Sequence, residues 1–549
     1  MKTQALIIAA IAGCSTAPRV PAARFANAPI VTAVDDRRDV QAPPHARAFY
    51  LHLYHYDGIL QRRLSRALEL PRERRALGVN ALDEVPDSTW FTNRIGARDL
   101  TLDELRAGPT TIDSPELHKP WTVHSTKTGG TELGLMITDA RGEQFLLKFD
   151  SSEFPEQETA THVIVGKLLW ACGFNVTEDF LVMFRTTDLV LAPDAVTKDL
   201  QGNKRPLDRA KLERDLAQLA STDGTFRGMA SRWLAGKALG GHPAEGVRDD
   251  DPNDRIAHEL RRDLRGSYSI MAWLDHVDIQ EGNFIDMWAT DRHDPKRHYV
   301  KHYLVDFGKS LGVMSTTGHD PRRGHEYVVD LADMSRSLVT GGVVLRPWEH
   351  REVPSLRGVG LFEAKTFDPG AWKPDSPAYV PFLVADRIDK LWGARILIRF
   401  TREQLRAIVE TGRLSDPRAV DYITDTLVAR QRATARYWFA RTSPLERFAI
   451  TDGALCFDDP AVIHHLTAGE TRYAVTRLAR DEHALGPAIE VHADPHGRTC
   501  TGPIALSSDG DGYTIVEIDT VADHPLSIFV HIARDPASGA ARVIGIWRP

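Results

Sequence analysis

The spacing of hydrophobic residues changes along the chain, and each change predicts a different kind of element. Residues 46–118 carry apolar side chains at helical spacing and predict a helical N-terminal extension. Residues 119–150 instead alternate apolar and polar positions in three short runs separated by turns, a pattern that predicts strands. An apolar stripe with helical spacing over 156–172, followed by Gly173, predicts a helix that comes directly after them.

The second half of the chain is helical first and strand-rich afterwards. Residues 253–274 predict a long helix, and residues 380–441 are mainly helical by the same criterion. From residue 445 short alternating runs return, which is typical of a separate β domain. The fold class expected from this order is α+β, with a strand-rich part, a helix-rich part and a C-terminal domain that resembles a β-sandwich.

These patterns divide the chain into six expected parts. The first three are a signal peptide (1–14), an Ala- and Pro-rich flexible tether (15–45) and the N-terminal helical extension (46–118). The other three are a strand-rich lobe (119–200), a helix-rich lobe with insertions (201–441) and a C-terminal β-rich domain (445–549). A length of 549 residues agrees with two to four folded domains.

Composition and charge exclude several classes of protein. Hydrophobic residues make up 42% of the chain and charged residues 26%, which excludes a disordered chain. The net charge of −7 gives no support to nucleic-acid binding, which usually requires a basic surplus. No apolar run reaches 18 residues, so the sequence predicts no membrane-spanning helix.

The first residues resemble the export signal of a bacterial lipoprotein. Lys2 precedes a short apolar run, and Ile11–Cys14 is similar to a lipobox, in which Cys14 becomes the lipidated residue after cleavage. Ser15 then favours the outer membrane, on its periplasmic face. The resemblance implies a protein of the cell envelope that touches the membrane only through this lipid. The alternative is a secreted chain with an incidental cysteine.

The other three cysteines have different expected environments. Cys172 lies within an apolar helical pattern and is expected to be buried. Cys456 and Cys500 both fall in the C-terminal β-rich region and are able to pair in an oxidising compartment, although the sequence alone does not show that they are close. No cysteine or histidine cluster has zinc-binding spacing.

Two motifs in the middle of the chain carry the chemistry. The first is HVDIQEGN, His276–Asn283, and the second is VDFG, Val305–Gly308. They follow a glycine-bearing hairpin, a strand that carries Lys148 and a helix that carries Glu158. Each part alone is common by chance, but the order of all of them resembles the protein-kinase-like superfamily. The first motif aligns without gaps on the catalytic-loop pattern HRDLKPEN, and the second aligns on DFG.

This resemblance implies a bilobal kinase-like fold that binds ATP and Mg²⁺. Asp306 and Asn283 are the expected metal ligands, because Mg²⁺ prefers hard oxygen donors. Asp278 is expected to accept a hydrogen bond from the attacking hydroxyl and to orient it. Lys148 is expected to neutralise the nucleotide phosphates and to be anchored by Glu158, with the nearby acids Glu153 and Glu156 as rivals.

Four further residues have expected roles by the same resemblance. Gly129, Gly130 and Gly134 would let backbone N–H groups approach the phosphates, although hairpin turns often contain such glycines for other reasons. His276 is expected to hold the catalytic loop through a hydrogen bond and not to act as the base.

The sequence also departs from the protein-kinase pattern. Val277 replaces an arginine, no APE motif follows DFG, and Asp306 comes 23 residues after Asn283, which predicts an extended hairpin between them. Three functions stay open: a phosphotransferase acting on an unknown hydroxyl acceptor, an inactive binding or scaffold module, and a nucleotidyl (AMP) transferase. In each case the C-terminal domain is a possible binding site for a protein or glycan partner.

Overall fold

The computed structural model describes ten segments of the chain. These are residues 25–67, 74–127, 133–199, 203–219, 221–314, 319–352, 354–467, 469–508, 510–522 and 524–549. The expected signal peptide with Cys14, and the expected phosphate-loop residues Gly129 and Gly130, lie outside the described residues. Helices and strands are both present in quantity, so the α+β class is confirmed.

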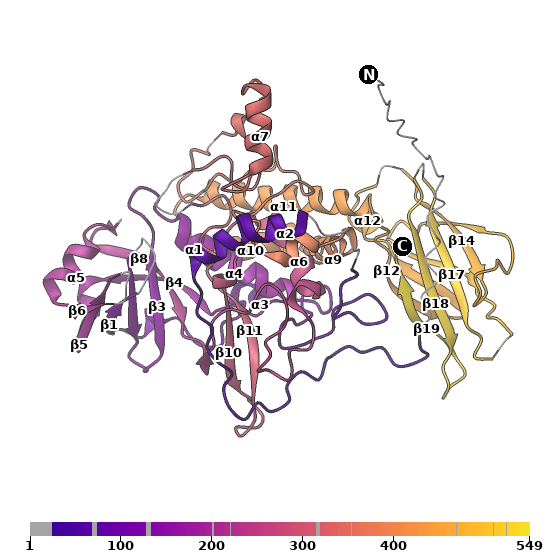
Figure 1. The fold of residues 1–549 in the computed structure, drawn as a ribbon, viewed down its shortest axis with the longest axis horizontal. Coiled ribbons are helices and arrows are strands. Elements are labelled where there is room, and N and C mark those ends of the chain that lie inside the picture. The colour runs from indigo at the N-terminus through magenta and orange to yellow at the C-terminus, as the bar shows by residue number, and fades with distance from the viewer. Residues whose placement is uncertain are drawn as a thin grey trace, which may run out of the picture.

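One end of the molecule is a mixed sheet (Figure 1), whose strands follow the order β4-β8-β3-β2-β1-β5-β6, with β7 paired to β8. Every neighbouring pair is antiparallel except β1 with β5. The strands are β1 Trp121–Thr126, β2 Gly134–Thr138, β3 Gln144–Phe149, β4 Asp179–Arg185, β5 Leu189–Lys198, β6 Lys204–Pro206, β7 Ser221–Thr222 and β8 Thr225–Arg232.

Alternation along β3 decides which side chains face the core of this lobe. Phe145, Leu147 and Phe149 are buried in a cluster that also contains Trp121. Because successive side chains of a strand point to opposite faces, Lys148 is directed to the other side of the sheet. Helix α5, Arg209–Leu216, contributes two leucines to the same cluster.

The strand-rich lobe extends further along the chain than the sequence indicated. We expected it to end at residue 200, but β8 lies between β3 and β4 and carries the sheet to Arg232. Strand β8 was missed because the polar sequence around it suggested a solvent-exposed insertion. Met229 and Ala230 of β8 are nevertheless almost completely buried.

The centre of the molecule is a helical lobe built around α6, Arg262–Leu274, all of whose residues are buried. The surrounding helices are α4 Gln157–Cys172, α8 Val380–Val384, α9 Arg387–Leu397, α10 Arg402–Glu410 and α11 Pro417–Phe439, and a further helix, α7 Leu331–Thr340, projects from the body (Figure 1). A three-stranded sheet in the order β11-β10-β9 completes the lobe, with strands β9 Lys237–Ala238, β10 Phe284–Thr290 and β11 His298–Leu304. One large apolar cluster joins α4 to these helices.

The C-terminal domain contains two sheets, drawn in yellow in Figure 1. Their orders are β12-β13-β16 and β15-β14-β17-β18-β19. The elements are β12 Glu446–Thr451, β13 Ala454–Asp458, α12 Pro460–Ile463, β14 Arg472–Leu478, β15 Ile489–His492, β16 Arg498–Pro503, β17 Thr514–Thr520, β18 Ser527–Arg534 and β19 Ala541–Trp547. Cys456 and Cys500 face each other on β13 and β16 and form a disulfide, while Cys172 is free and buried.

The N-terminal segment corrects one expectation. Residues 25–45 are not a free tether, because they pack along the body between the C-terminal domain and the helical lobe. The Asn27 Nδ2 donates to the carbonyl of Arg534, and buried Asp36 accepts from Thr89. Alanine and proline content suggested a linker, but paired polar side chains fix the segment.

The N-terminal extension then forms short helices: α1 Leu51–Tyr56, a π-helical turn Asp57–Gln61, α2 Arg62–Ala67 and α3 Leu102–Ala107. Thr101 and Glu104 form a capping box at the start of α3. Among the described residues, no helix is long and apolar enough to cross a membrane.

We predict that the disulfide stabilises the C-terminal domain. The bridge closes a loop of 44 residues, and closing such a loop restricts the unfolded chain, which corresponds to a stabilisation of about 2–4 kcal/mol. Adding dithiothreitol should therefore lower the melting temperature of the transition that reports on this domain. The same addition should leave a Cys456→Ala/Cys500→Ala double variant unchanged, and an equal shift in both proteins would contradict the prediction.

Candidate active site

An ion pair between the two lobes forms the centre of the site. Lys148 lies on β3, and its Nζ donates to Asp306 Oδ1 at 2.7 Å. Asp306 follows two residues after the end of β11. Burial by itself would lower the pKa of Lys148, but the charges of Asp306, Glu158 and Asp179 outweigh it and raise the pKa. Burial likewise acts against the Asp306 carboxylate, but Lys148 and His162 hold its pKa well below the ordinary value. Both groups of the pair are therefore charged at neutral pH.

The hairpin β10–β11 explains how Asn283 reaches Asp306 across 23 residues of sequence. The two strands pair in unbroken antiparallel register from Phe284 opposite Leu304 to Thr290 opposite His298. The Val305 N–H then donates to the Asn283 carbonyl at 3.0 Å. The residues that bracket the hairpin, Asn283 and Asp306, consequently emerge side by side at its base.

The backbone of Asp306 is in an unusual conformation. Its φ is +65°, in the left-handed region that non-glycine residues rarely adopt. Such a conformation persists where surrounding contacts impose it, and it is concentrated at functional sites. Here the ion pair with Lys148 and the donation from the Phe307 N–H to His162 Nε2 at 3.3 Å hold the turn in place.

The catalytic-loop motif forms the other wall of the site. Asn283 Nδ2 donates to the Asp278 carbonyl at 2.5 Å, which closes the loop on itself. The Asp278 carboxylate accepts from Lys309 Nζ at 2.9 Å, directly after the DFG motif. Lys309 was not singled out from the sequence. Its position after Gly308 is the only signal that would have identified it.

His276 anchors this loop from within the core. Its Nδ1 lies 2.8 Å from the Ser310 hydroxyl, and the ring is almost completely buried. Burial lowers the pKa of His276 to about 4, so the ring is neutral near pH 7. This arrangement suits a residue that positions the loop and does not transfer protons.

Glu158 lies beside the ion pair, in the first turn of α4. A Cβ added to Gly308 would come within 2.8 Å of its Cγ, so this acid packs tightly against the DFG turn. Asp306, and not Glu158, is the hydrogen-bond partner that the structure gives to Lys148, while the charge of Glu158 still acts on the lysine. The rival Glu156 points elsewhere, because its carboxylate accepts from Arg357 and from the Ser415 N–H.

His162, one turn after Glu158, is a site residue that sequence reasoning missed. Its Nδ1 lies 3.1 Å from Asp179 Oδ2 and its Nε2 lies 3.6 Å from Asp306 Oδ1. The ring therefore links the start of β4 to the DFG turn. A histidine within an apolar helical stripe looks like an ordinary core residue, and only the fold shows that two carboxylates flank it.

Gly134 lies directly opposite Lys148 in the β2–β3 ladder. A Cβ at this position would come within 3.3 Å of the Leu147 carbonyl oxygen and against the Lys127 side chain. The chain therefore needs a small residue here, next to the lysine.

The oxygen donors of the site fit a divalent cation. Asp306 Oδ1 accepts the hydrogen bond from Lys148. Among the described residues, nothing donates a hydrogen bond to its Oδ2, and the Asp306 side chain is 50% exposed. Asn283 uses its Nδ2 for the loop, which leaves its Oδ1 without a donor from the same residues. Two hard oxygen ligands at the base of one hairpin are the type of donor set that Mg²⁺ or Mn²⁺ prefers.

A second cluster of possible ligands lies deeper in the helical lobe. His242, Asp286 and His302 are all buried and bring their side-chain donors within 4.8 Å of one another. Histidine spacing in the sequence gave no sign of it. However, Arg248 Nη2 already pairs with Asp286 Oδ2 at 3.0 Å and neutralises this carboxylate. His302 Nδ1 lies 2.7 Å from the other oxygen, Asp286 Oδ1, and burial lowers the pKa of His242 to about 4. Because both oxygens of Asp286 are engaged, we interpret the cluster as a neutral structural network.

No protein-family profile and no curated protein matches the sequence. Among solved structures, the chain is similar to the Helicobacter pylori proinflammatory kinase CtkA, with 10% identity, a TM-score of 0.30 and coverage of 58% of this chain and 94% of that one.

Two structures of the Golgi casein kinase are also similar, and one of them has Mn/ADP bound. Both share 11% identity with this chain, and their TM-scores are 0.29 and 0.28. The first match covers 61% of this chain and 73% of the kinase, and the second covers 62% of this chain and 75% of the kinase. All three TM-scores are below 0.5, so no argument is based on these likenesses. In this chain, a sheet lobe holds Lys148 on its third strand, and this lysine pairs with Asp306 of the second motif.

We predict that Asp286→Asn destabilises the helical lobe. Asp286 is fully buried and accepts from Arg248 and His302, so neutralising it leaves a buried guanidinium without its carboxylate. The expected loss is about 3–5 kcal/mol, measured by urea unfolding. Asp250→Asn is the matched control, because Asp250 is partly exposed and lies 4.0 Å from Arg248; it should change stability by less than about 1 kcal/mol.

The same measurement tests the interpretation of the cluster as metal-free. Dialysis of the wild-type protein against EDTA should leave its urea midpoint unchanged. A marked loss of stability that Zn²⁺ restores would contradict a neutral network.

Proposed function

We propose that the protein is an ATP- and Mg²⁺-dependent phosphotransferase that acts on a hydroxyl acceptor. One observation carries the proposal: the free oxygens of Asp306 and Asn283 lie at the base of one hairpin, between Lys148 and Asp278. Phosphoryl transfer requires little from a protein beyond positioning and charge neutralisation. An amine, two metal ligands and a carboxylate that faces the acceptor are sufficient for that task.

Each of these residues has a role that follows from its position. When a nucleotide binds, the Lys148 ammonium moves part of its interaction from Asp306 to the phosphates. Its position on strand β3 keeps the ammonium close to them. Asp306 and Asn283 hold the divalent cation, which supplies charge neutralisation for the phosphates when it is bound. Glu158 and Asp179 keep Lys148 protonated while it does so.

Asp278 is the proposed orienting group for the acceptor. It accepts the hydrogen bond of the hydroxyl, whose oxygen forms a bond to the γ-phosphorus while the bond from that phosphorus to the leaving diphosphate breaks; the proton passes to Asp278. Gln280 occupies the position of the lysine in HRDLKPEN. Lys309 supplies an ammonium in its place, 2.9 Å from Asp278 Oδ2.

The location of this activity is a separate proposal that rests on the sequence. The similarity of Ile11–Cys14 to a lipobox supports an envelope lipoprotein that is anchored through Cys14. The acceptor would then be a molecule of the envelope, and the C-terminal β domain is the part available to bind a protein or glycan partner.

A binding or scaffold module is the second candidate function, and one observation favours it. Both Lys148 and Asp278 are engaged with other side chains of the protein, Asp306 and Lys309. A site that only holds a ligand does not need to release these pairs. Nucleotidyl transfer uses the same groups, so the reaction products separate it from phosphoryl transfer.

We predict that ATP stabilises the protein only when Mg²⁺ or Mn²⁺ is present. A ligand at 100 times its dissociation constant stabilises the native state by about 2.7 kcal/mol, which raises the melting temperature by a few degrees. Asp306→Asn should remove this shift, since it loses the charge that binds the metal. Asp294→Asn, at the exposed tip of the β10–β11 hairpin, should keep it. No shift in the wild-type protein would refute nucleotide binding.

We also predict that Asp278→Asn separates binding from chemistry. This variant should keep the shift with ATP and Mg²⁺, because Asp278 is not proposed to hold the metal. Its turnover, measured as ADP release with mass analysis of the products, should fall by a factor of about 10²–10⁴. Nucleotide binding without any turnover in the wild-type protein would favour the scaffold function, and release of pyrophosphate would favour AMP transfer.

A further inference from the structure

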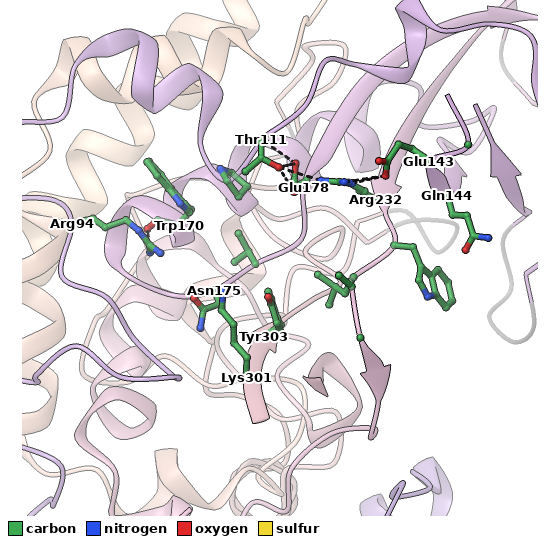
Figure 2. Close-up of a pocket in the computed structure, with 17 residues that line it drawn as sticks. Arg94, Thr111, Glu143, Gln144, Trp170, Asn175, Glu178, Arg232, Lys301 and Tyr303 are labelled. Carbon is green, nitrogen blue, oxygen red and sulfur yellow. Dashed lines mark hydrogen bonds and ion pairs between the residues drawn. The ribbon is translucent and has the colours of Figure 1, made fainter. Parts of the chain in front are cut away.

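A second pocket lies at the junction of the two lobes, away from the proposed active site (Figure 2). Its volume is about 560 Å³, within the range of small-molecule sites. The end of β8 with residues 233–236, the segment 175–178 and strand β11 form its walls. Neither Lys148 nor Asp306 lines it. The structure thus contains a ligand-sized cavity that the proposed transfer reaction does not use.

One end of this pocket contains two cationic side chains, Arg94 and Lys301. Among the described residues, no carboxylate oxygen forms an ion pair with either side chain, and the Lys301 ammonium makes no hydrogen bond. Two backbone carbonyls fix Arg94, whose Nη1 donates to Trp170 at 2.7 Å and to Phe174 at 3.1 Å. The Lys301 ammonium lies 5.0 Å from the centre of the Tyr303 ring.

The surroundings of Lys301 and Arg94 disfavour the charged form of both side chains and lower their pKa values. Burial, followed by the charges of Arg94, Arg37 and Arg292, lowers the pKa of Lys301 to about 8. Burial also lowers the pKa of Arg94 to about 10. Like charges brought together with little water repel each other, and an anion placed between them would relieve that repulsion.

The opposite end of the pocket contains more acidic than basic side chains. Arg232 pairs with Glu143 at 3.0 Å and with Glu178 at 2.9 Å, so two carboxylates share one guanidinium. Thr111 also donates to Glu178 (Figure 2). This end therefore carries a negative surplus and would repel a second anionic group.

We propose that the pocket binds a small organic acid whose carboxylate or phosphate lies between Arg94 and Lys301. The rings of Trp170 and Tyr303 line the same end and provide apolar surface for the body of the ligand. The acidic end restricts the ligand to one with a neutral or cationic remainder, which excludes polyanions such as nucleic acids. Because β8 and β11 both contribute walls, the ligand would contact both lobes at once.

Isothermal titration of the full chain with benzoate, phenyl phosphate and benzyl alcohol tests the proposal. The first two probes have a ring with one acid group, and the third is a neutral analogue. We expect at least one acid to bind with one-to-one stoichiometry in the micromolar to millimolar range. Benzyl alcohol should bind at least tenfold more weakly. The preferred acid shows whether the site is built for a carboxylate or a phosphate.

Variants then locate the binding site. Lys301→Met should weaken binding of the acid at least tenfold, and Arg94→Gln should do the same. Lys301→Met alone decides the question if loss of the Arg94 contacts to the backbone prevents folding. Lys204→Met is the matched control, because this lysine is exposed on β6 and far from the pocket in the fold; it should bind like the wild-type protein.

Three results would overturn the proposal. They are no binding of either acid to the wild-type protein, equal affinity for benzyl alcohol, and unchanged affinity in a folded Lys301→Met variant. The proposed ATP site does not affect these outcomes, since no nucleotide or divalent cation is present in the titration.

Discussion

The ion pair between Lys148 and Asp306 is the interaction on which the arrangement of the site depends. It joins the sheet lobe to the helical lobe, with 2.7 Å between Lys148 Nζ and Asp306 Oδ1. Glu158 and Asp179 are close enough to keep the lysine charged, and His162 lies between Asp179 and Asp306. The two lobes therefore meet through charges and not only through apolar packing. At this polar junction, here termed the cleft, the Asp306 side chain is half exposed.

A buried network of charges keeps the parts around this cleft in a fixed relation. Asp83 of the N-terminal extension pairs with Arg262 of α6 and with Arg548 at the end of the chain. Arg262 also pairs with Asp389 of α9. Each charge in this chain of contacts is compensated by a neighbour, as buried charges require. The extension, the helical lobe and the C-terminal domain are thus held together at a site that is remote from the cleft.

The sequence predicted the local elements of the site well, because the residues that define them are adjacent in the chain. Alternation gave β3 with Lys148 on its polar face, and helical spacing gave α4. The expected hairpin brings Asn283 to the base of β10 and Val305 opposite it, next to Asp306. Long-range relations were harder: β8 joins the sheet from a polar stretch, and residues 25–45 pack on the body despite a linker-like composition. His162 and Lys309 were missed because neither carries a local signal that distinguishes it from a core histidine or a surface lysine.

Charge balance in the cleft shows why a metal belongs in any nucleotide-binding role for this protein. The cleft holds the carboxylates of Glu158, Asp278 and Asp306, while Lys148 and Lys309 provide the ammonium groups. The two lysines pair with Asp306 and Asp278, so neither ammonium is fully available for a triphosphate that carries several negative charges. A nucleotide alone would be repelled at close range, since charges in a partly buried cleft interact strongly. In the proposed reaction, the oxygens of Asp306 and Asn283 would recruit the missing positive charge as a divalent cation, and so would connect metal binding to nucleotide binding.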